Sequence, residues 1–298
     1  MLRIGENLNV ISTELGAAMK EMNPDPIKRM ALDQAEKKVD FIDINIGPAR
    51  KNGPELMEWI VKTVQEVVPD IPLALDTSNV EAIEAGLKVH KGKALINSIM
   101  ARQERMDALI PLAAKYNAAC IALLWGPQGM PRDENERSEL TVTLLSAILE
   151  AGVAPEDIYL DPIATPVCVQ QDQVKSMFNF MMMLPDLSEA LGASGLNSTC
   201  GLSNTSNGTP DHLRPIINQT SMVILEKYGM TSAIVDAFDD RLTALCKGEF
   251  ENIKKIILDV TDGKEVDQGS LSKEEIDYLK TAKVILGHSL YSDSWLEI

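Results

Sequence analysis

Polar side chains recur where short apolar runs end in this sequence of 298 residues. They are carboxylates and carboxamides, with almost no lysine or arginine among them. The set is Glu6, Asn7, Asn9, Asp43, Asn45, Asp76, Asn97, Asp161, Asn204 and Asp236. Carboxylates only accept hydrogen bonds, whereas carboxamides both donate and accept them. A phosphate-rich ligand needs cations, so the set favours a nitrogen-containing ring such as a pterin.

Each of these residues, taken alone, also has a purely structural explanation. Asp76 precedes Thr77 and Asn79, where a helix is expected to begin, and Asp161 precedes Pro162, where a turn is expected. Aspartate and asparagine are common at such caps and turns. Capping does not require a polar residue at nearly every strand end, however, so the whole set indicates a binding site.

Apolar runs rich in isoleucine, valine and leucine alternate with segments of helical period, the pattern of repeated βα units. Eight strands are predicted, at residues 2–9, 41–46, 72–76, 94–97, 119–124, 158–161, 199–203 and 232–235. This pattern predicts a (β/α)8 barrel, in which the carboxyl ends of all strands meet at one mouth. Residues distant in sequence would therefore form one site.

Helices are predicted between the strands, some beginning at a capping residue such as Asn79 or Asp239. Their ranges are 26–38, 54–67, 79–88, 104–116, 134–151, 172–184, 210–228 and 239–247. Two further helices are predicted at 249–260 and 273–282, within a helical insertion at 249–282 of a single domain spanning 1–298. A doubly wound open sheet fits much of this pattern, but no GxGxxG follows the first strand.

Composition excludes several classes of protein. The net charge is −16, with no cluster of basic residues, which disfavours nucleic acid and anionic membranes as partners. The four cysteines form no CxxC pair, and the three histidines form no HxH or HExxH motif. We therefore expect no metal site. The sequence shows neither a secretory signal nor an apolar stretch long enough to span a membrane, which predicts a cytoplasmic protein.

Six strings along the chain resemble the pterin-binding methyltransferases. The similarity is greatest to the methyltetrahydrofolate:corrinoid/iron-sulfur protein methyltransferases. The folate domain of cobalamin-dependent methionine synthase and dihydropteroate synthase are more distant. The similarity covers residues 2 to about 238 and resumes at 281–295. The strings are IGENLN at 4–9, DINIGPA at 43–49, LDTSN at 75–79, INS at 96–98, LDP at 160–162 and GLSN at 201–204.

The resemblance implies a role for individual residues. Asp76, Asn97 and Asp161 match the positions that hold the pterin ring, and Asn204 matches the position that hydrogen-bonds N5. Mouth-lining or supporting positions are implied less directly for Glu6, Asn9, Asp43, Asn45, Ser203 and Asn207. Asn207 stands where the similar enzymes have glutamine, and the segment 247–270 has no counterpart in them.

The resemblance further implies methyl exchange between N5 of methyltetrahydrofolate and cob(I)alamin. The cobalamin would be carried by a partner corrinoid protein, and this chain would form a homodimer. Asn204 does not titrate, so its part would be to stabilise a protonated N5 through its carbonyl oxygen. Two alternatives stay open: a dihydropteroate synthase-like condensation, and a non-catalytic folate-binding protein on the same barrel.

Overall fold

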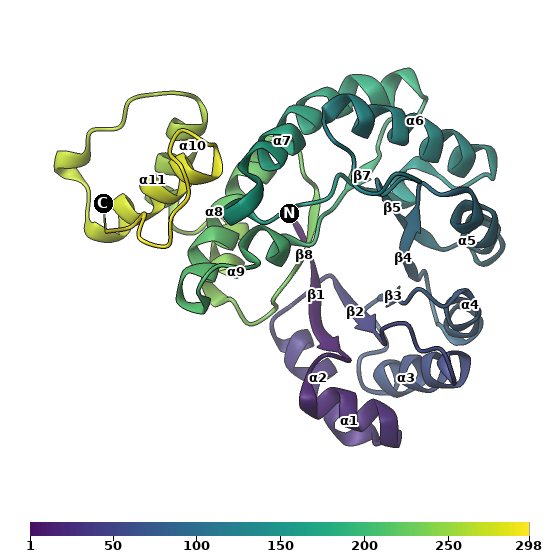
Figure 1. The fold of residues 1–298 in the computed structure, drawn as a ribbon. Helices are drawn as coiled ribbons and strands as arrows, with labels where there is room; N and C mark the ends of the chain where they lie inside the picture. The colour runs from purple at the N-terminus through teal and green to yellow at the C-terminus, as the bar shows by residue number, and fades with distance from the viewer. Residues whose placement is uncertain (298) are drawn as a thin grey trace.

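The computed structural model describes residues 1–297, and its centre is a sheet of eight parallel strands closed into a barrel (Figure 1). The strand order β7-β6-β5-β4-β3-β2-β1-β8 brings the first and last strands together. The predicted (β/α)8 barrel is therefore confirmed. The strands are β1 Leu2–Asn9, β2 Phe41–Asn45, β3 Leu73–Asp76, β4 Leu95–Met100, β5 Ala119–Leu123, β6 Ile158–Asp161, β7 Asn197–Ser198 and β8 Ser232–Val235.

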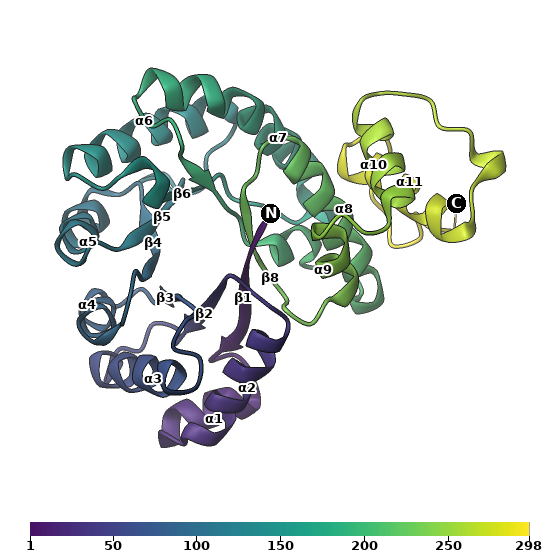
Figure 2. The same ribbon diagram turned by 180° about the vertical axis from the view of Figure 1, so that it is seen from behind.

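Helices surround this barrel, as Figure 1 and the reverse view in Figure 2 show. Asn79 caps α4 and Asp239 caps α9, each accepting a first-turn amide as predicted. The helices are α1 Thr13–Glu21, α2 Pro24–Glu36, α3 Gly53–Val67, α4 Val80–Val89, α5 Gln103–Tyr116, α6 Glu134–Glu150, α7 Val167–Ala190, α8 Arg214–Lys227, α9 Asp240–Cys246, α10 Glu251–Thr261 and α11 Lys273–Ile285.

The predicted seventh strand at 199–203 is wrong. The strand β7 comprises Asn197–Ser198, and the chain then turns into a 3-10 helix, η2, at Leu202–Ser206. The hydroxyl groups of Thr205 and Ser206 each donate to a carbonyl three residues earlier. Such local bonds compete with a strand ladder. The barrel closes here through a single bridge from Gly201 to Ile234 and through bonds of Ser198 with Thr231.

Alternate residues of the strands fill the inside of the barrel with a small apolar cluster. Phe41 and Tyr159 meet edge to face within it, with ring centroids 6.0 Å apart. The fully buried members are Ile4, Ala74, Leu95, Ala119, Ile121 and Tyr159, with Phe41 and Ile234 packed against them. Because side chains alternate along a strand, the residue two positions later points into the barrel again, one layer nearer the mouth.

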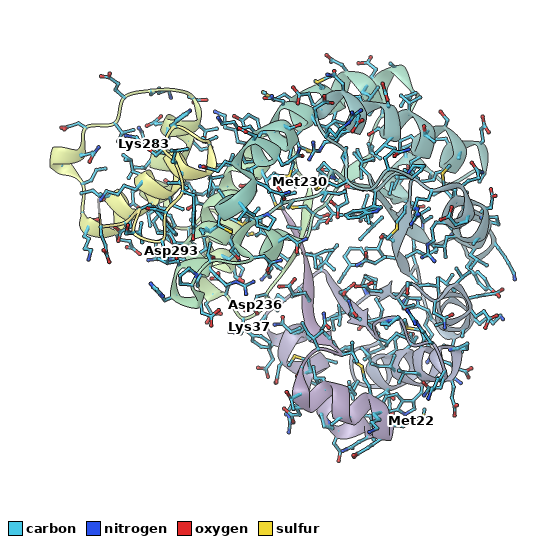
Figure 3. All side chains as sticks on the ribbon, in the orientation of Figure 1. Met22, Lys37, Met230, Asp236, Lys283 and Asp293 are labelled. Atoms are coloured by element: carbon cyan, nitrogen blue, oxygen red, sulfur yellow. The ribbon has the colours of Figure 1, made fainter. Side chains whose placement is uncertain are left out.

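The helices α10 and α11 form an appendage beside the barrel (Figures 1 and 2), in the segment where two helices were predicted. In Figure 3, Lys283 and Asp293 are labelled on the C-terminal part of the chain and Asp236 on the barrel. Apolar side chains of the appendage, such as Ile257, are buried, and Tyr278 donates to Gln219 of α8. Among residues 1–297, no helix is long and apolar enough to cross a membrane.

Candidate active site

A ring of polar side chains lies directly above the apolar cluster. On six strands, the residue two positions beyond a member of that cluster is a carboxylate or a carboxamide. Strand register places Asp76 level with Asn45 on one side and with Asn97 on the other. The structure thus gathers most of the residues selected from the sequence. The ring consists of Glu6, Asp43, Asp76, Asn97, Asp161 and Asp236.

Two amides of the ring hold carboxylates in place. The Nδ2 atom of Asn97 donates to Oδ1 of Asp43 at 2.9 Å, reaching from β4 to β2 past the intervening strand. Asn45 donates to Oδ2 of Asp76 from the neighbouring strand, and its own Oδ1 accepts from the backbone N–H of Gly47 at 2.9 Å. Asn45 therefore orients Asp76.

Burial raises the pKa values of four carboxyl groups in this ring, those of Glu6, Asp43, Asp76 and Asp161. Desolvation raises the pKa of Asp43 well above its usual value, and the nearby Asp76 adds to the effect. Desolvation likewise raises the pKa of Asp76 to about 6, against the opposing hydrogen bond from Asn45. The pKa of Glu6 is raised by burial too, although its hydrogen bond from Ser203 lowers it. Groups shifted in this way cluster at functional sites.

Asp161 sits in a constrained turn at the end of β6. Its Oδ1 accepts from the backbone N–H of Ile163 at 2.8 Å, and Ile163 has a φ of +69°, which a β-branched residue rarely adopts. The side chain is buried, and desolvation raises its pKa to about 7. Among residues 1–297, no group donates a hydrogen bond to Oδ2, which leaves this oxygen for a ligand.

Asn204 lies in η2 at the rim of the mouth, beside the ring. The hydroxyl group of Ser203 donates to Glu6 at 2.5 Å, which ties η2 to β1. The side chain of Asn204 is exposed, and its Oδ1 accepts from Nδ2 of Asn207 at 3.3 Å. The side chains of Asn204 and Asn207 therefore lie in contact.

Asn9 forms hydrogen bonds within the turn that follows β1. Its Oδ1 accepts from the backbone N–H of Ile11 at 3.0 Å, and its carbonyl oxygen accepts from the N–H of Ser12. Both bonds shape the turn that leads into α1. Asn7 also lies at this end of β1 and donates to Asp236 at 2.8 Å.

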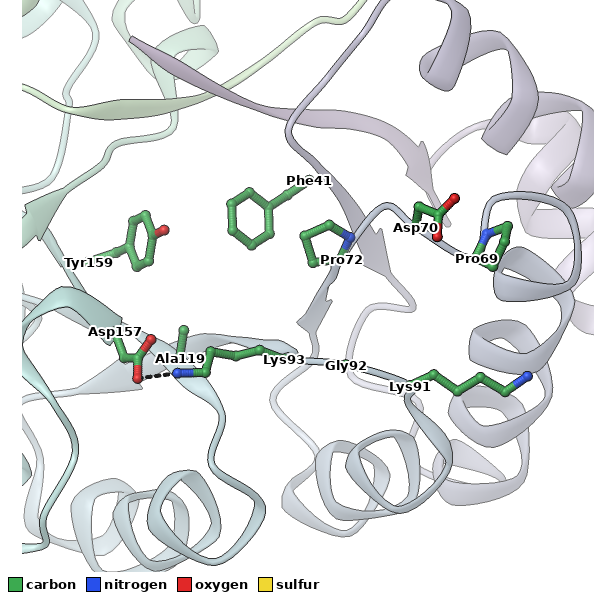
Figure 4. Close-up of a pocket in the computed structure, with 10 residues that line it drawn as sticks. All are labelled: Phe41, Pro69, Asp70, Pro72, Lys91, Gly92, Lys93, Ala119, Asp157 and Tyr159. Carbon is green, nitrogen blue, oxygen red and sulfur yellow. Dashed lines mark hydrogen bonds and ion pairs between the residues drawn. The ribbon is translucent and has the colours of Figure 1, made fainter.

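Two cavities lie at opposite ends of the barrel. One of about 540 Å³ adjoins the ring at the rim and is lined by Glu6, Ser203 and Arg214 among others. The other, of about 340 Å³, opens at the amino ends of the strands (Figure 4). There Phe41 and Tyr159 face each other, and Lys93 pairs with Asp157. In this fold that end generally contributes stability, and sites lie at the mouth.

A comparison with known families identifies the family of this chain. A family model described as pterin binding enzyme matches residues 5–236, most of the chain. The chain belongs to the pterin-binding enzymes. The matched span begins just before Glu6 and ends at Asp236, so it contains every member of the polar ring.

Individual relatives of this pterin-binding enzyme agree with the family. A methylcorrinoid:tetrahydrofolate methyltransferase from Eubacterium limosum is 29% identical over 238 residues, covering 79% of this chain and 85% of the relative. Dihydropteroate synthases share the fold. The Vibrio fischeri structure has a TM-score of 0.63 at 19% identity, covering 84% of this chain and 93% of its own. The Yersinia pestis structure has a TM-score of 0.59 at 20% identity, covering 84% of this chain and 93% of its own.

Sequence reasoning missed one residue beside this site, Arg137 of α6. Its side chain is fully buried, and its Nε donates to the carbonyl oxygen of Pro162, next to Asp161. A signal was present in the sequence, because Arg137 shares a helix face with Thr141, Leu144 and Ile148. A charged residue is rarely buried on the apolar face of a helix unless other groups bond to it.

Proposed function

We propose that this chain transfers the N5 methyl group between methyltetrahydrofolate and the cobalt of a corrinoid protein. One observation carries the proposal: the polar ring, free of basic residues, lies beside Asn204 in a chain of the pterin-binding family. The relative from Eubacterium limosum, named for exchange between a methylcorrinoid and tetrahydrofolate, supports this reading over other reactions of the family.

The ring suits a pterin in its donors and acceptors. The 2-amino group and ring N–H of the pterin would donate to Asp161 and Asp76, which each have one carboxylate oxygen without a donor among residues 1–297. An amide carries two N–H groups, so Asn97 retains one for the 4-oxo group of the pterin after bonding Asp43. Each bond would contribute about 1–3 kcal/mol relative to an unpaired buried group.

Asn204 would act on N5, where the reaction takes place. When methyltetrahydrofolate is the donor, the N5–methyl bond breaks, and the amine leaves as a neutral group only if N5 holds a proton. The carbonyl oxygen of Asn204 accepts one hydrogen bond from Asn207 and has a second lone pair for that N–H. Stabilising the protonated state more than the ground state accelerates transfer.

In the opposite direction the same geometry also applies. A lone pair on N5 of tetrahydrofolate would form the bond to the methyl group while the cobalt–carbon bond of the corrinoid breaks and leaves its electron pair on the cobalt, and the N5 proton would leave to solvent. The cobalt of the corrinoid takes up or supplies the methyl group. Because the mouth must admit that group, we propose that the corrinoid protein docks over the rim near Asn204, and that a cytoplasmic homodimer associates through other surfaces.

A dihydropteroate synthase-like condensation is the main rival. It would have to hold a pterin diphosphate, which calls for cations. Within the described chain the ring itself holds no basic residue, and Arg214 stands at the rim, donating to Ser206 and Asn207. Likeness at about 20% identity to dihydropteroate synthases shows the fold alone.

One experiment separates the three readings. The purified protein is given either methyltetrahydrofolate with cob(I)alamin or a pterin diphosphate with p-aminobenzoate, and the products are resolved by chromatography. Formation of tetrahydrofolate in the first mixture alone supports methyl transfer. Dihydropteroate in the second would support the rival, and folate binding without either product would indicate a binding protein.

A further inference from the structure

Arg137 is a buried cation that belongs to none of the proposed catalytic steps. All three of its guanidinium nitrogens donate hydrogen bonds: Nε to the carbonyl oxygen of Pro162 at 2.9 Å, Nη1 to Ser176 at 2.9 Å and Nη2 to Gln173 at 3.1 Å. None of these three acceptors is a carboxylate. Keeping such a charge buried is costly, so its location calls for a function.

The acceptor on the barrel side is the turn that follows β6. Pro162 separates Asp161 from Ile163, whose left-handed backbone is unfavourable for a β-branched residue. The turn is fixed at two points, by Arg137 on the Pro162 carbonyl and by Ile163 on Oδ1 of Asp161. Strained backbone of this kind persists where its surroundings determine it, and it clusters at functional sites.

We propose that Arg137 is a positioning residue for pterin binding, which holds the turn that orients Asp161 after β6 and places a positive charge behind that carboxyl group. This inference rests on the proposed function, because it assigns Asp161 the role of pterin acceptor. Arg137 itself touches no substrate in this arrangement. It acts from α6, through its hydrogen bond to the carbonyl oxygen of Pro162 and through its charge.

The charges around this turn favour the assignment. Arg137 lowers the pKa of Asp161 against the larger opposing effect of burial. Burial lowers the pKa of Arg137 to about 10, so it stays protonated at neutral pH. The negative charges of Glu134 in α6 and of Asp133 just before it raise the pKa of Arg137. The thiol of Cys200, after β7, lies near Asp161. Arg137 is the one cation of this group.

The test compares Arg137→Gln and Arg137→Lys with wild type by titrating methyltetrahydrofolate at several pH values. The Gln variant loses the charge, so its binding midpoint moves to higher pH, and affinity below about pH 6 falls about tenfold, as for one pKa unit. The Lys variant keeps the charge but not the planar fork, so affinity falls at every pH while the midpoint stays in place.

The matched control is Arg132→Gln, which removes an exposed arginine paired with Glu136 at the start of the same helix. It should leave both affinity and midpoint unchanged, because surface charges are screened. Wild-type binding by both Arg137 variants would overturn the proposal. An affinity loss in Arg137→Gln without movement of the midpoint would also overturn it, by leaving a structural role only.

Melting curves identify variants that do not fold. If Arg137→Gln does not fold, the Lys variant decides the matter, because wild-type affinity in that variant refutes the positioning role. Failure of the proposed function is distinguishable, since wild type would then bind no folate or transfer no methyl group, whatever Arg137 does.

Discussion

The side chain of Asn97 is oriented by Asp43, which accepts its Nδ2 hydrogen at 2.9 Å from two strands away. The bond distinguishes the nitrogen of the amide from its oxygen, and it leaves Oδ1 and one N–H of Asn97 without a hydrogen-bond partner among residues 1–297. A fully buried carboxylate therefore serves as the support of a neutral amide at the centre of the candidate site.

Replacing Asn97 with alanine should weaken methyltetrahydrofolate binding about 10- to 100-fold, corresponding to about 1–3 kcal/mol. The substitution removes a ligand contact and leaves Oδ1 of Asp43 without its donor. Isothermal titration calorimetry measures the change. Asn252→Ala, at an exposed amide of α10 bonded to Glu275, is the control and should bind as wild type does. Equal affinity of the two variants would contradict the assignment.

Folate affinity of the wild type should decrease as pH falls through about 7 and then 6. Asp161 and Asp76 have pKa values raised to about 7 and about 6, and a protonated carboxyl loses acceptor capacity. Fluorescence titrations between about pH 8 and pH 5 test this dependence. In Asp161→Asn the upper part of the decrease should vanish. A flat wild-type profile would show that neither carboxylate binds the ligand.

Asp161→Asn should stabilise the ligand-free protein above about pH 7 and have little effect near pH 4. A carboxyl whose folded pKa exceeds its unfolded value costs stability once it ionises, and the cost disappears at pH values below both. At 1.36 kcal/mol per pKa unit, the gain is at most about 4 kcal/mol. Urea unfolding at both pH values measures it, and a gain that is larger at low pH would refute the cause assigned.

Gly201→Ala should slow methyl transfer while leaving folate binding nearly intact. A Cβ at Gly201 would lie 2.9 Å from Nδ2 of Asn204, so that amide must move. The backbone at Gly201, with φ of −70°, accepts alanine without strain. Gly269→Ala, where a Cβ meets only ordinary contacts, is the control. Rapid single-turnover kinetics distinguish transfer from binding, and an unchanged transfer rate would remove Asn204 from the reaction.

The barrel could be predicted because apolar runs alternate with helical segments, and most of its polar ring because polar residues follow those runs. Asp76, for example, ends an apolar run, and parallel strands bring all such ends to one mouth. Asn9 also ends a strand but turns toward Ile11, because a short side chain near a turn bonds its own backbone.

Other features depend on packing that no local pattern reveals. The strand β7 is short because hydroxyl groups of Thr205 and Ser206 take local carbonyls, and α1 follows a capping Ser12 that the sequence reading passed over. The partner of Asn97 lies two strands away, so only the rotamers within the closed barrel decide it. The burial of Arg137 likewise results from α6 packing on α7.

The most direct test of methyl transfer at Asn204 is a spectral assay of cob(I)alamin with methyltetrahydrofolate, comparing wild type with Asn204→Ala. We expect wild type to form methylcobalamin, and the variant to bind folate but to react at least about 100-fold more slowly, as for the loss of one transition-state hydrogen bond. Folate binding without transfer by wild type, even with candidate corrinoid proteins, would contradict the proposed function.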